Sequence, residues 1–145
     1  MKRERHMTEI VIDENPAPEG REQILRPLVE FNLAHAGEFK YGNVALYIKQ
    51  PGQDAAVGGL WGRFAAGWLF VELLFVPEEL RGQGLGAQLM QQAEALARKH
   101  DSIGLWLDSF SFQAPGFYKK LGYSCFGTLA DFPKGETRYF FSKRF

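Results

Sequence analysis

Apolar residues recur along the chain with two different spacings, and the spacing changes several times between Thr8 and Phe145. Alternation or a short continuous apolar run favours a strand, whereas a spacing near 3.6 favours a helix. Strands are expected at residues 8–12, 44–49, 56–64, 68–76, 103–107, 123–128 and 138–145. Helices are expected at residues 20–36, 85–97 and 113–121. The pattern therefore predicts a protein of the α/β class.

The apolar run WLFVELLFV, residues 68–76, is the centre of this pattern. Its near-continuous hydrophobicity predicts burial on both faces, as in the middle of a sheet. A helix and a further apolar strand follow it, and this order predicts a right-handed crossover that joins two parallel strands. The last two strands, around the loop ADFPKGET, predict an antiparallel pair. The apolar stretch YFFSKRF within that pair predicts a sheet edge at which a homodimer could form.

Composition adds limits to this picture. The chain has 145 residues, which fits a single domain over residues 8–145 after a disordered basic extension of residues 1–7. Lys plus Arg (17) equals Asp plus Glu (17), so neither nucleic acid nor an anionic membrane is expected as a partner. The N-terminus lacks the apolar core of a signal peptide, and no apolar run approaches the ~18 residues of a membrane span.

The cysteine and histidine content argues against a metal centre. Cys125 is the one cysteine, which excludes an intramolecular disulfide and any site with several cysteine ligands. A reducing cytoplasm fits this usage, and we expect Cys125 to be a buried small residue. No cluster of His, Asp and Glu has the spacing of metal ligands, so no metal is expected.

The stretch VPEELRGQGLG raises the question of chemistry, because Gly82, Gly84 and Gly86 stand where a helix should begin. Glycine costs about 1 kcal/mol relative to alanine inside a helix. A helix N-terminus offers unpaired N–H groups and a partial positive charge, and glycines let a ligand approach the backbone closely. Arg81 adds a full positive charge at the entrance of this loop. The stretch therefore predicts a cradle for a diphosphate.

The glycines alone do not identify the diphosphate. The Walker pattern GxxxxGK[ST] is absent, and the dinucleotide pattern GxGxxG fails because residue 87 is Ala. Of the acidic residues, only Asp108 ends a strand near the place where a dinucleotide site needs one. A tight turn into a core helix, with no ligand, stays open as an alternative.

Two motifs resemble those of the GNAT superfamily of N-acetyltransferases. Arg81-x-x-Gly84-x-Gly86, after an apolar strand, is similar to the acyl-CoA signature Gln/Arg-x-x-Gly-x-Gly/Ala of that superfamily. Residues 111–123, SFQAPGFYKKLGY, resemble its later motif, in which Asn-x-x-Ala precedes Phe/Leu-Tyr-x-Lys-Leu-Gly-Phe/Tyr. Ser111 stands where the family often has Asn. The resemblance is specific across residues 68–123 and follows the element order over residues 8–145.

The resemblance implies a fold and a cofactor. The fold would be a mixed, mostly antiparallel sheet of six to seven strands with a central parallel, splayed pair, flanked by three to four helices. Acetyl-CoA would be the co-substrate, with its pyrophosphate on the glycine loop and its pantetheine arm along the preceding strand. Ordinary pairing of that strand remains the alternative to splaying. The residues implied to bind coenzyme A are Leu74, Phe75, Val76, Arg81, Gly82, Gln83, Gly84, Leu85, Gly86, Ala87, Phe117, Tyr118 and Lys120.

Acetylation of an amine requires a neutral nitrogen, a polarised thioester carbonyl and protonation of the leaving thiolate. The resemblance implies that Tyr118 lies beside the sulfur and donates its phenolic proton; a core aromatic is the alternative. Glu72 is the one charge within its apolar strand, and burial would raise its pKa toward that of a useful base. Alternation would place it on the face of Leu74 and Val76, and an ion pair within the sheet is the alternative. Asp108, or a chain of waters, could serve as the base instead.

The acceptor is expected to be the amine of a small molecule or a peptide. Its pocket would come from residues 31–43, the last hairpin and residues 108–112. Aromatic residues proposed for its wall are Phe31, Phe39, Tyr41, Phe110, Phe112 and Phe132, and acidic residues that would attract a cation are Glu30, Glu38, Asp108 and Asp131. A module that binds acyl-CoA without turnover, or a different nucleotide-binding protein, would fit the same glycine loop.

Overall fold

The computed structural model describes residues 7–145 of the chain. Apart from Met7, the expected disordered extension therefore lies outside the described residues. The chain divides into two compact units, one ending at Glu38 and one spanning Phe39–Phe145. Each unit is described by itself below, and the expectation of a single domain over residues 8–145 stays a prediction.

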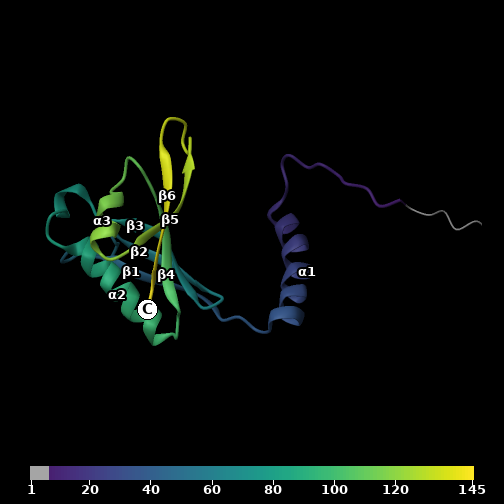
Figure 1. Ribbon diagram of the computed structural model, residues 1–145, viewed down its shortest axis with the longest axis horizontal. Helices are drawn as coiled ribbons and strands as arrows, with labels where there is room; N and C mark the ends of the chain where they lie inside the picture. Colours follow the sequence, from purple (N-terminus) through teal and green to yellow (C-terminus); the bar gives the residue numbers. More distant parts are fainter. Residues whose placement is uncertain (1–6) are drawn as a thin grey trace, which may run out of the picture. The chain divides into compact units, whose positions relative to one another are not determined.

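Helix α1 (Pro18–Ala36) forms the ordered element of the first unit (Figure 1). It begins at Pro18, since proline lacks an N–H group and its fixed φ suits the first helical turn. It ends at Gly37, whose N–H group donates to the carbonyl of Leu33 at 3.2 Å. The predicted helix over 20–36 is confirmed, with Pro27 inside it. The predicted strand at residues 8–12 is wrong: this segment has no strand partner within residues 7–145, and alternation alone does not make a strand.

The second unit contains a six-stranded sheet in the order β1-β2-β3-β4-β6-β5. Its elements are β1 (Tyr41–Ile48), β2 (Gly58–Ala65), β3 (Trp68–Phe75), the short 3₁₀ helix η1 (Glu78–Leu80), α2 (Leu85–Lys99), β4 (Gly104–Phe110), α3 (Pro115–Lys120), β5 (Ser124–Ala130) and β6 (Thr137–Arg144). Neighbouring strands are antiparallel except β3 and β4, which are parallel. This confirms the predicted α/β fold, a mixed and mostly antiparallel sheet with one central parallel pair (Figure 1).

The C-terminal strand is not a sheet edge, so that prediction is wrong. β6 lies between β4 and β5 and pairs with both of them. Its apolar residues serve the core, where Phe141 is fully buried, and not an exposed edge. The edges are β1 and β5. The expected burial of Cys125 is also wrong: it lies on the edge strand β5 and is exposed.

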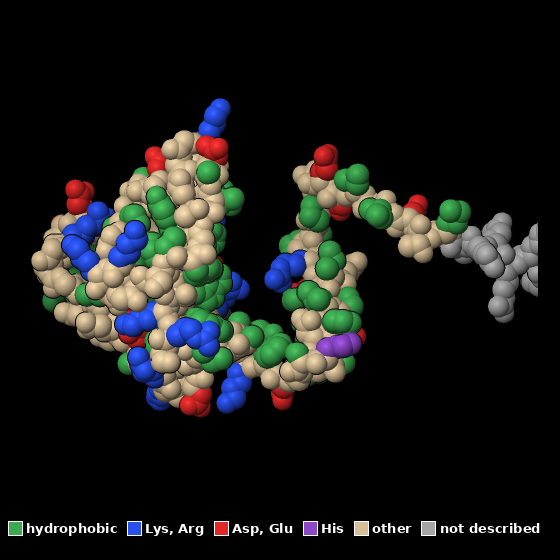
Figure 2. Space-filling model, viewed as in Figure 1, with side chains coloured by type: hydrophobic (Ala, Val, Ile, Leu, Met, Phe, Trp, Pro, Cys, Tyr) green, Lys and Arg blue, Asp and Glu red, His purple; other side chains and the backbone are tan. Residues whose placement is uncertain are grey.

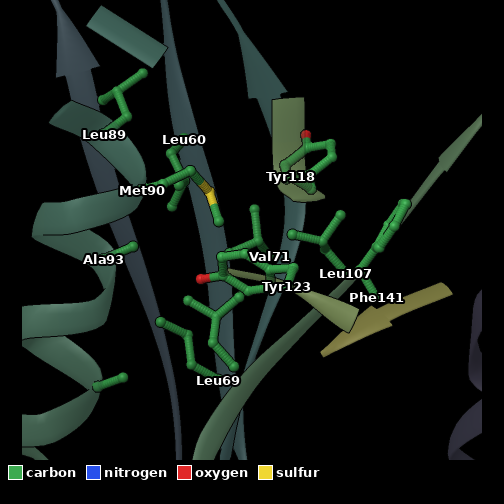
Figure 3. Close-up of a cluster of buried hydrophobic side chains, with 12 residues drawn as sticks. Leu60, Leu69, Val71, Leu89, Met90, Ala93, Leu107, Tyr118, Tyr123 and Phe141 are labelled. Atoms are coloured by element: carbon green, nitrogen blue, oxygen red, sulfur yellow. The ribbon is translucent and has the colours of Figure 1, made fainter. Parts of the chain in front are cut away.

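The hydrophobic core lies between the sheet and helices α2 and α3. Leu89, Met90, Ala93 and Ala97 form the buried face of α2, at the spacing that the sequence predicts. They pack against strand residues that include Leu69, Val71, Leu105, Leu107 and Phe141 (Figure 3). Each large aliphatic side chain buried in this way contributes about 1.5–3 kcal/mol. The packing fixes the N-terminus of α2 beside the ends of β3 and β4.

A β-bulge interrupts the pairing of β2 with β3. Gly62 pairs with Val71 and the adjacent Trp61 pairs with Leu73, so Glu72 is an extra residue on β3. Bulges bend a strand and redirect its side chains. This bulge stands where the parallel pairing of β3 with β4 stops, because Val71 and Leu107 form the last pair of that ladder. The predicted splaying of the parallel pair is therefore confirmed.

The bulge also corrects two expectations about β3. Leu74 and Val76 pack against the core together with Val71, whereas Leu73 and Phe75 are exposed. Burial on both faces is thus wrong for the strand beyond Val71. The expectation that Glu72 shares a face with Leu74 and Val76 is wrong as well, since the extra residue breaks the period of two.

Candidate active site

A cleft of about 1010 Å³ opens where β3 and β4 separate. Its walls come from β3, from the loop and first turn of α2, from the end of β4 with the loop that follows, from α3 and from Arg138 on β6. The predicted site residues that line it are Glu72, Leu74, Phe75, Val76, Arg81, Gly82, Gly84, Leu85, Gly86, Ala87, Asp108, Phe117 and Tyr118. Gln83 and Lys120 are not in its lining. Ser109 and Arg138 also line the cleft, from residues 108–112 and the last hairpin, which were expected to contribute. Gln113 lines it as well and was not expected there.

The loop before α2 presents a row of unpartnered backbone N–H groups. The first helical hydrogen bond runs from the N–H of Gln88 to the carbonyl of Gly84, at 3.0 Å. The N–H groups of residues 82–87 have no hydrogen-bond partner within the described chain. Gly82 and Gly84 have φ of 78° and 79°, a conformation that other residues rarely adopt, and a Cβ on either would meet open space. These N–H groups, at the positive end of a 15-residue helix, fit a diphosphate.

Two further contacts fix this loop. The Arg81 Nε donates to the carbonyl of Val76 at 2.9 Å, which ties the loop to the end of β3. A Cβ on Gly86 would lie 3.2 Å from Phe117 Cζ, so the first turn of α2 approaches α3 closely and a larger residue there would require the Phe117 ring to shift. The glycine loop before α2, the β3 terminus and α3 are thereby held as one wall of the cleft.

Tyr118 belongs both to the core and to the cleft. Its ring packs near Tyr123 and Phe141 and its side chain is only 9% exposed. Its hydroxyl has no hydrogen-bond partner among the described residues, and it is directed away from the aliphatic cluster (Figure 3). Burial, and secondly the negative charge of Asp108, raise the pKa of Tyr118 to about 12. The phenol therefore keeps its proton at neutral pH and can act as a donor.

A polar network holds α3 in place. The Tyr123 hydroxyl donates to Glu94 Oε1 at 2.8 Å, and Lys143 Nζ donates to both oxygens of Glu94 at 3.1 and 3.2 Å. Lys143 also donates to the carbonyl of Leu121, at the C-terminal end of α3, at 3.1 Å. Burial and the hydrogen bond to Glu94 raise the pKa of Tyr123 far above its usual value. The network joins α2, β6 and the end of α3, and so fixes the position of Tyr118.

Glu72 is not the buried carboxylate that the sequence suggested. Its side chain is 43% exposed and its Oε2 lies 3.3 Å from Arg63 Nε on β2. The ion pair within the sheet is therefore the arrangement found, because the bulge turns Glu72 out of the core. Glu72 still lines the cleft at the point where the strands separate.

Asp108 lies across the cleft from β3, on the β4 side of the separation. Its Oδ1 is 2.7 Å from Arg138 Nη2, and the two side chains are 15% and 26% exposed. Phe110 and Phe112 line the cleft nearby, with ring centroids 5.2 Å apart and planes 5° apart. Phe132 approaches Phe110 from the β5–β6 hairpin at 5.8 Å. Part of the expected aromatic wall is therefore present.

Other residues expected at the acceptor pocket have different places. Phe39 and Tyr41 contact each other at 6.4 Å and do not line the cleft. Asp131 accepts a hydrogen bond from the N–H of Gly135 in the hairpin turn, at 3.1 Å. Glu30, Phe31 and Glu38 belong to the first unit, and their part in the site stays a prediction.

Ser111, at the position of the family's Asn, does not line the cleft. Its hydroxyl is hydrogen-bonded to Glu136 and accepts from the N–H of Thr137, so it fastens the base of the β5–β6 hairpin. The neighbouring Gln113 does line the cleft. Its Oε1 accepts from the buried Ser109 hydroxyl at 3.2 Å and from the N–H of Phe110 at 2.9 Å. Gln113, rather than Ser111, therefore shapes the loop beside α3.

Within residues 7–145 no group of three or more His, Cys, Asp and Glu side chains could hold a metal ion. No helix in the same range is long and apolar enough to span a membrane. Figure 2 shows Lys and Arg side chains interspersed with Asp and Glu over the visible face of the larger unit.

Comparisons with known proteins agree with this geometry. A family profile described as the acetyltransferase (GNAT) domain matches residues 41–125. An acetyltransferase of Agrobacterium fabrum is 37% identical over 127 residues, which are 88% of this chain and 92% of that protein. The blasticidin-S acetyltransferase of Streptomyces morookaense is 42% identical over 87 residues, which are 59% of this chain and 64% of that protein.

A solved structure supports the same assignment. A crystal structure from Agrobacterium tumefaciens, named as an acetyltransferase, superposes with a TM-score of 0.88 at 35% identity, covering 95% of this chain and 100% of that one. The chain belongs to the GNAT acetyltransferase family.

Proposed function

We propose that this protein transfers the acetyl group of acetyl-CoA to a primary amine of a small molecule or peptide, by direct attack in a ternary complex. The observation that carries the proposal is the cleft beyond the last β3–β4 pair, Val71 with Leu107, which contains both the unpartnered N–H loop and Tyr118. A Bacillus anthracis acetyltransferase whose crystal structure contains acetyl coenzyme A shares this fold, with a TM-score of 0.51 at 19% identity.

The chain's own groups suit the parts of coenzyme A. The N–H groups of residues 82–87 and the Arg81 side chain supply positive charge for the diphosphate. On β3, residues beyond Val71 have no ladder partner on the β4 side, so backbone N–H and C=O groups there can bind the amides of the pantetheine arm. Backbone donors at this edge would also polarise the thioester carbonyl.

Tyr118 would act mainly as a hydrogen-bond donor to the leaving sulfur. An ordinary thiol has a pKa of about 8.5, and the pKa of Tyr118 is about 12. Full transfer of the phenolic proton to the thiolate would therefore be uphill by roughly 3 to 4 pKa units, or about 5 kcal/mol. In the balanced reaction the C–N bond forms, the C–S bond breaks, and the proton lost by nitrogen ends on sulfur. Tyr118 stabilises the thiolate until that proton arrives.

Asp108 is the carboxylate best placed to take the proton from the acceptor nitrogen. It lies in the cleft close enough for its charge to raise the pKa of Tyr118, whereas Glu72 is half exposed and paired with Arg63. A chain of waters that leads from the amine to Asp108 would serve the same purpose. Proximity of the two substrates supplies much of the remaining rate.

Small-molecule amines are the first acceptors to test, because the related Streptomyces morookaense protein is a blasticidin-S acetyltransferase. The test is an assay of thiol release from acetyl-CoA with polyamines, amino acids, aminoglycosides and peptides. Amine-dependent release supports the proposal. Binding of acetyl-CoA without release by any amine would identify a module that binds acyl-CoA without turnover. A cytoplasmic location and a homodimer stay predictions.

A further inference from the structure

Arg138 and Asp108 place two opposite charges side by side in the acceptor end of the cleft. They project from neighbouring strands, where Asp108 pairs with Phe140 and Phe110 pairs with Arg138. Both side chains line the cleft, and both are partly buried. A buried ion pair costs desolvation energy and is weak evidence of a purely stabilising role. Its position in the cleft points to a role in binding.

Aromatic rings hold the Arg138 guanidinium. Its Cζ lies 4.7 Å from the ring centroid of Phe132, 5.3 Å from that of Phe110 and 5.6 Å from that of Phe140. Its Nε is buried and has no hydrogen-bond partner among the described residues. The ion pair with Asp108 is made through Nη2, and no hydrogen bond of the guanidinium to another described residue is found. The rings thus fix an arginine that still has donors to offer to a ligand.

The order of the charged groups gives the acceptor an orientation. Asp108 is near enough to Tyr118 to raise the pKa of its phenol, and Arg138 lies beside Asp108, two pairs further along β4 and β6. An amine that reacts beside Tyr118 would therefore meet Asp108 first. Groups attached to that amine would meet Arg138.

An amine without an anionic group would gain little from this pair, because the charge of Arg138 offsets that of Asp108. A phosphate dianion would be repelled by Asp108 and by Glu72, which also lines the cleft. A carboxylate carries a single charge and matches the planar fork of an arginine. We therefore propose that the acceptor is a zwitterion, a small amine that carries a carboxylate, with its amine at Asp108 and its carboxylate at Arg138. This inference rests on the proposed acetyl transfer in the same cleft.

The test compares matched acceptors in the thiol-release assay with the full chain. Each of a set of L-amino acids is paired with its carboxamide, which keeps the amine but lacks the negative charge, and with its decarboxylated amine. The expected result is a kcat/KM for the best amino acids about tenfold or more above that of the matched amides, as a charge-assisted hydrogen bond provides. Equal values for acid and amide would overturn the inference and leave the proposed acetyl transfer intact. If none of the amines accelerates thiol release, the proposed function itself is rejected.

Variants separate recognition from positioning. Arg138→Gln is expected to raise KM for the amino acids about tenfold and to abolish their advantage over the amides, with Arg138→Lys giving partial rescue. Arg144→Gln is the matched control, since Arg144 lies on the same strand, also contacts an aromatic ring and does not line the cleft. A fall in kcat of similar size for acids and amides would mean that Arg138 only holds Asp108, and would contradict the proposal. Should Arg138→Gln fail to fold, the comparison of acid and amide with the unaltered chain decides the question.

Discussion

Val71 pairs with Leu107, and no residue of β3 after Val71 pairs with β4. The next residue, Glu72, is the extra residue of the β2–β3 bulge. The end of the ladder and the bulge thus coincide, and the cleft begins there. The helix that follows β3 then brings its unpartnered N–H groups to the same opening.

Replacement of Tyr118 by Phe should reduce turnover with little effect on binding or folding. The hydroxyl has no hydrogen-bond partner in the described structure, so its removal leaves no buried group unpaired. Loss of the donor to the leaving sulfur should lower kcat about 100-fold, the lower end of the effect of removing one donor to a developing anion, while KM for acetyl-CoA changes about twofold or less. Steady-state kinetics of thiol release measure both parameters.

Tyr123→Phe is the matched control for Tyr118→Phe. It removes the hydrogen bond to Glu94 and should lower the free energy of unfolding by about 1–3 kcal/mol, with a much smaller change in kcat. An unchanged kcat in Tyr118→Phe would exclude Tyr118 as the donor.

Gly84→Ala should weaken acetyl-CoA binding beyond its effect on stability. An alanine in the left-handed conformation costs about 1–2 kcal/mol, and the same cost applies to Gly52→Ala, since Gly52 has φ of 76° and open space around its Cα. Gly52 lies outside the cleft, between β1 and β2. Both variants should lose similar stability in denaturant titrations. Only Gly84→Ala should raise the Kd for acetyl-CoA, by about tenfold, when measured by calorimetry. Equal affinities in the two variants would show that the glycine loop is only a turn.

Asp108→Asn should impair the reaction more than Glu72→Gln. Asp108 is largely buried in the cleft and its charge acts on Tyr118, whereas Glu72 is half exposed and paired with Arg63. The expected loss of kcat/KM is about 100-fold for Asp108→Asn and less than about fivefold for Glu72→Gln. The ratio of the two effects is the observable, and a larger loss in Glu72→Gln would assign the base to Glu72.

Stability should fall at high pH through Tyr118. The pKa of Tyr118 is about 12 in the folded protein and 10.0 for an ordinary tyrosine, which is the value for the unfolded chain. Between these pH values the folded chain retains a proton that the unfolded chain releases. The contribution of this proton to the free energy of unfolding is complete below about pH 10. It is lost as the pH rises from about 10 to about 12, by about 2–3 kcal/mol in total. Unfolding of the native chain and of Tyr118→Phe, measured across this pH range, should show the native chain losing up to about 2–3 kcal/mol relative to the variant as the pH rises. A constant difference would mean that the phenol titrates normally.

Local patterns in the sequence predicted much of the fold. Alternation, the 3.6 spacing of Leu89, Met90, Ala93 and Ala97, and the glycines before α2 report local geometry, and the predicted helix and crossover are found. The splayed pair, which the resemblance to the GNAT superfamily implied, is found as well. Residues of the β3 end, the glycine loop and the later motif, which the sequence indicated, form most of the cleft lining.

What the sequence missed depends on contacts between distant segments. A bulge at Glu72 requires the register of β2 against β3, which residue alternation does not contain. The insertion of β6 between β4 and β5 brings Arg138 to Asp108 across 30 positions. The last hairpin was expected at the acceptor pocket, but its pairing with Asp108 could not be read from the sequence. The exposure of Cys125 follows from the same insertion, because it leaves β5 at the edge.

Thiol release from acetyl-CoA, measured with and without amines, tests the central claim most directly. The chain should release coenzyme A in proportion to the amine added, with saturation in both substrates, and Tyr118→Phe should bind acetyl-CoA normally while it releases thiol about 100-fold more slowly. If the chain binds acetyl-CoA and no amine accelerates thiol release, or if Tyr118→Phe matches the native rate, the account of this cleft as an acetyl-transfer site is contradicted.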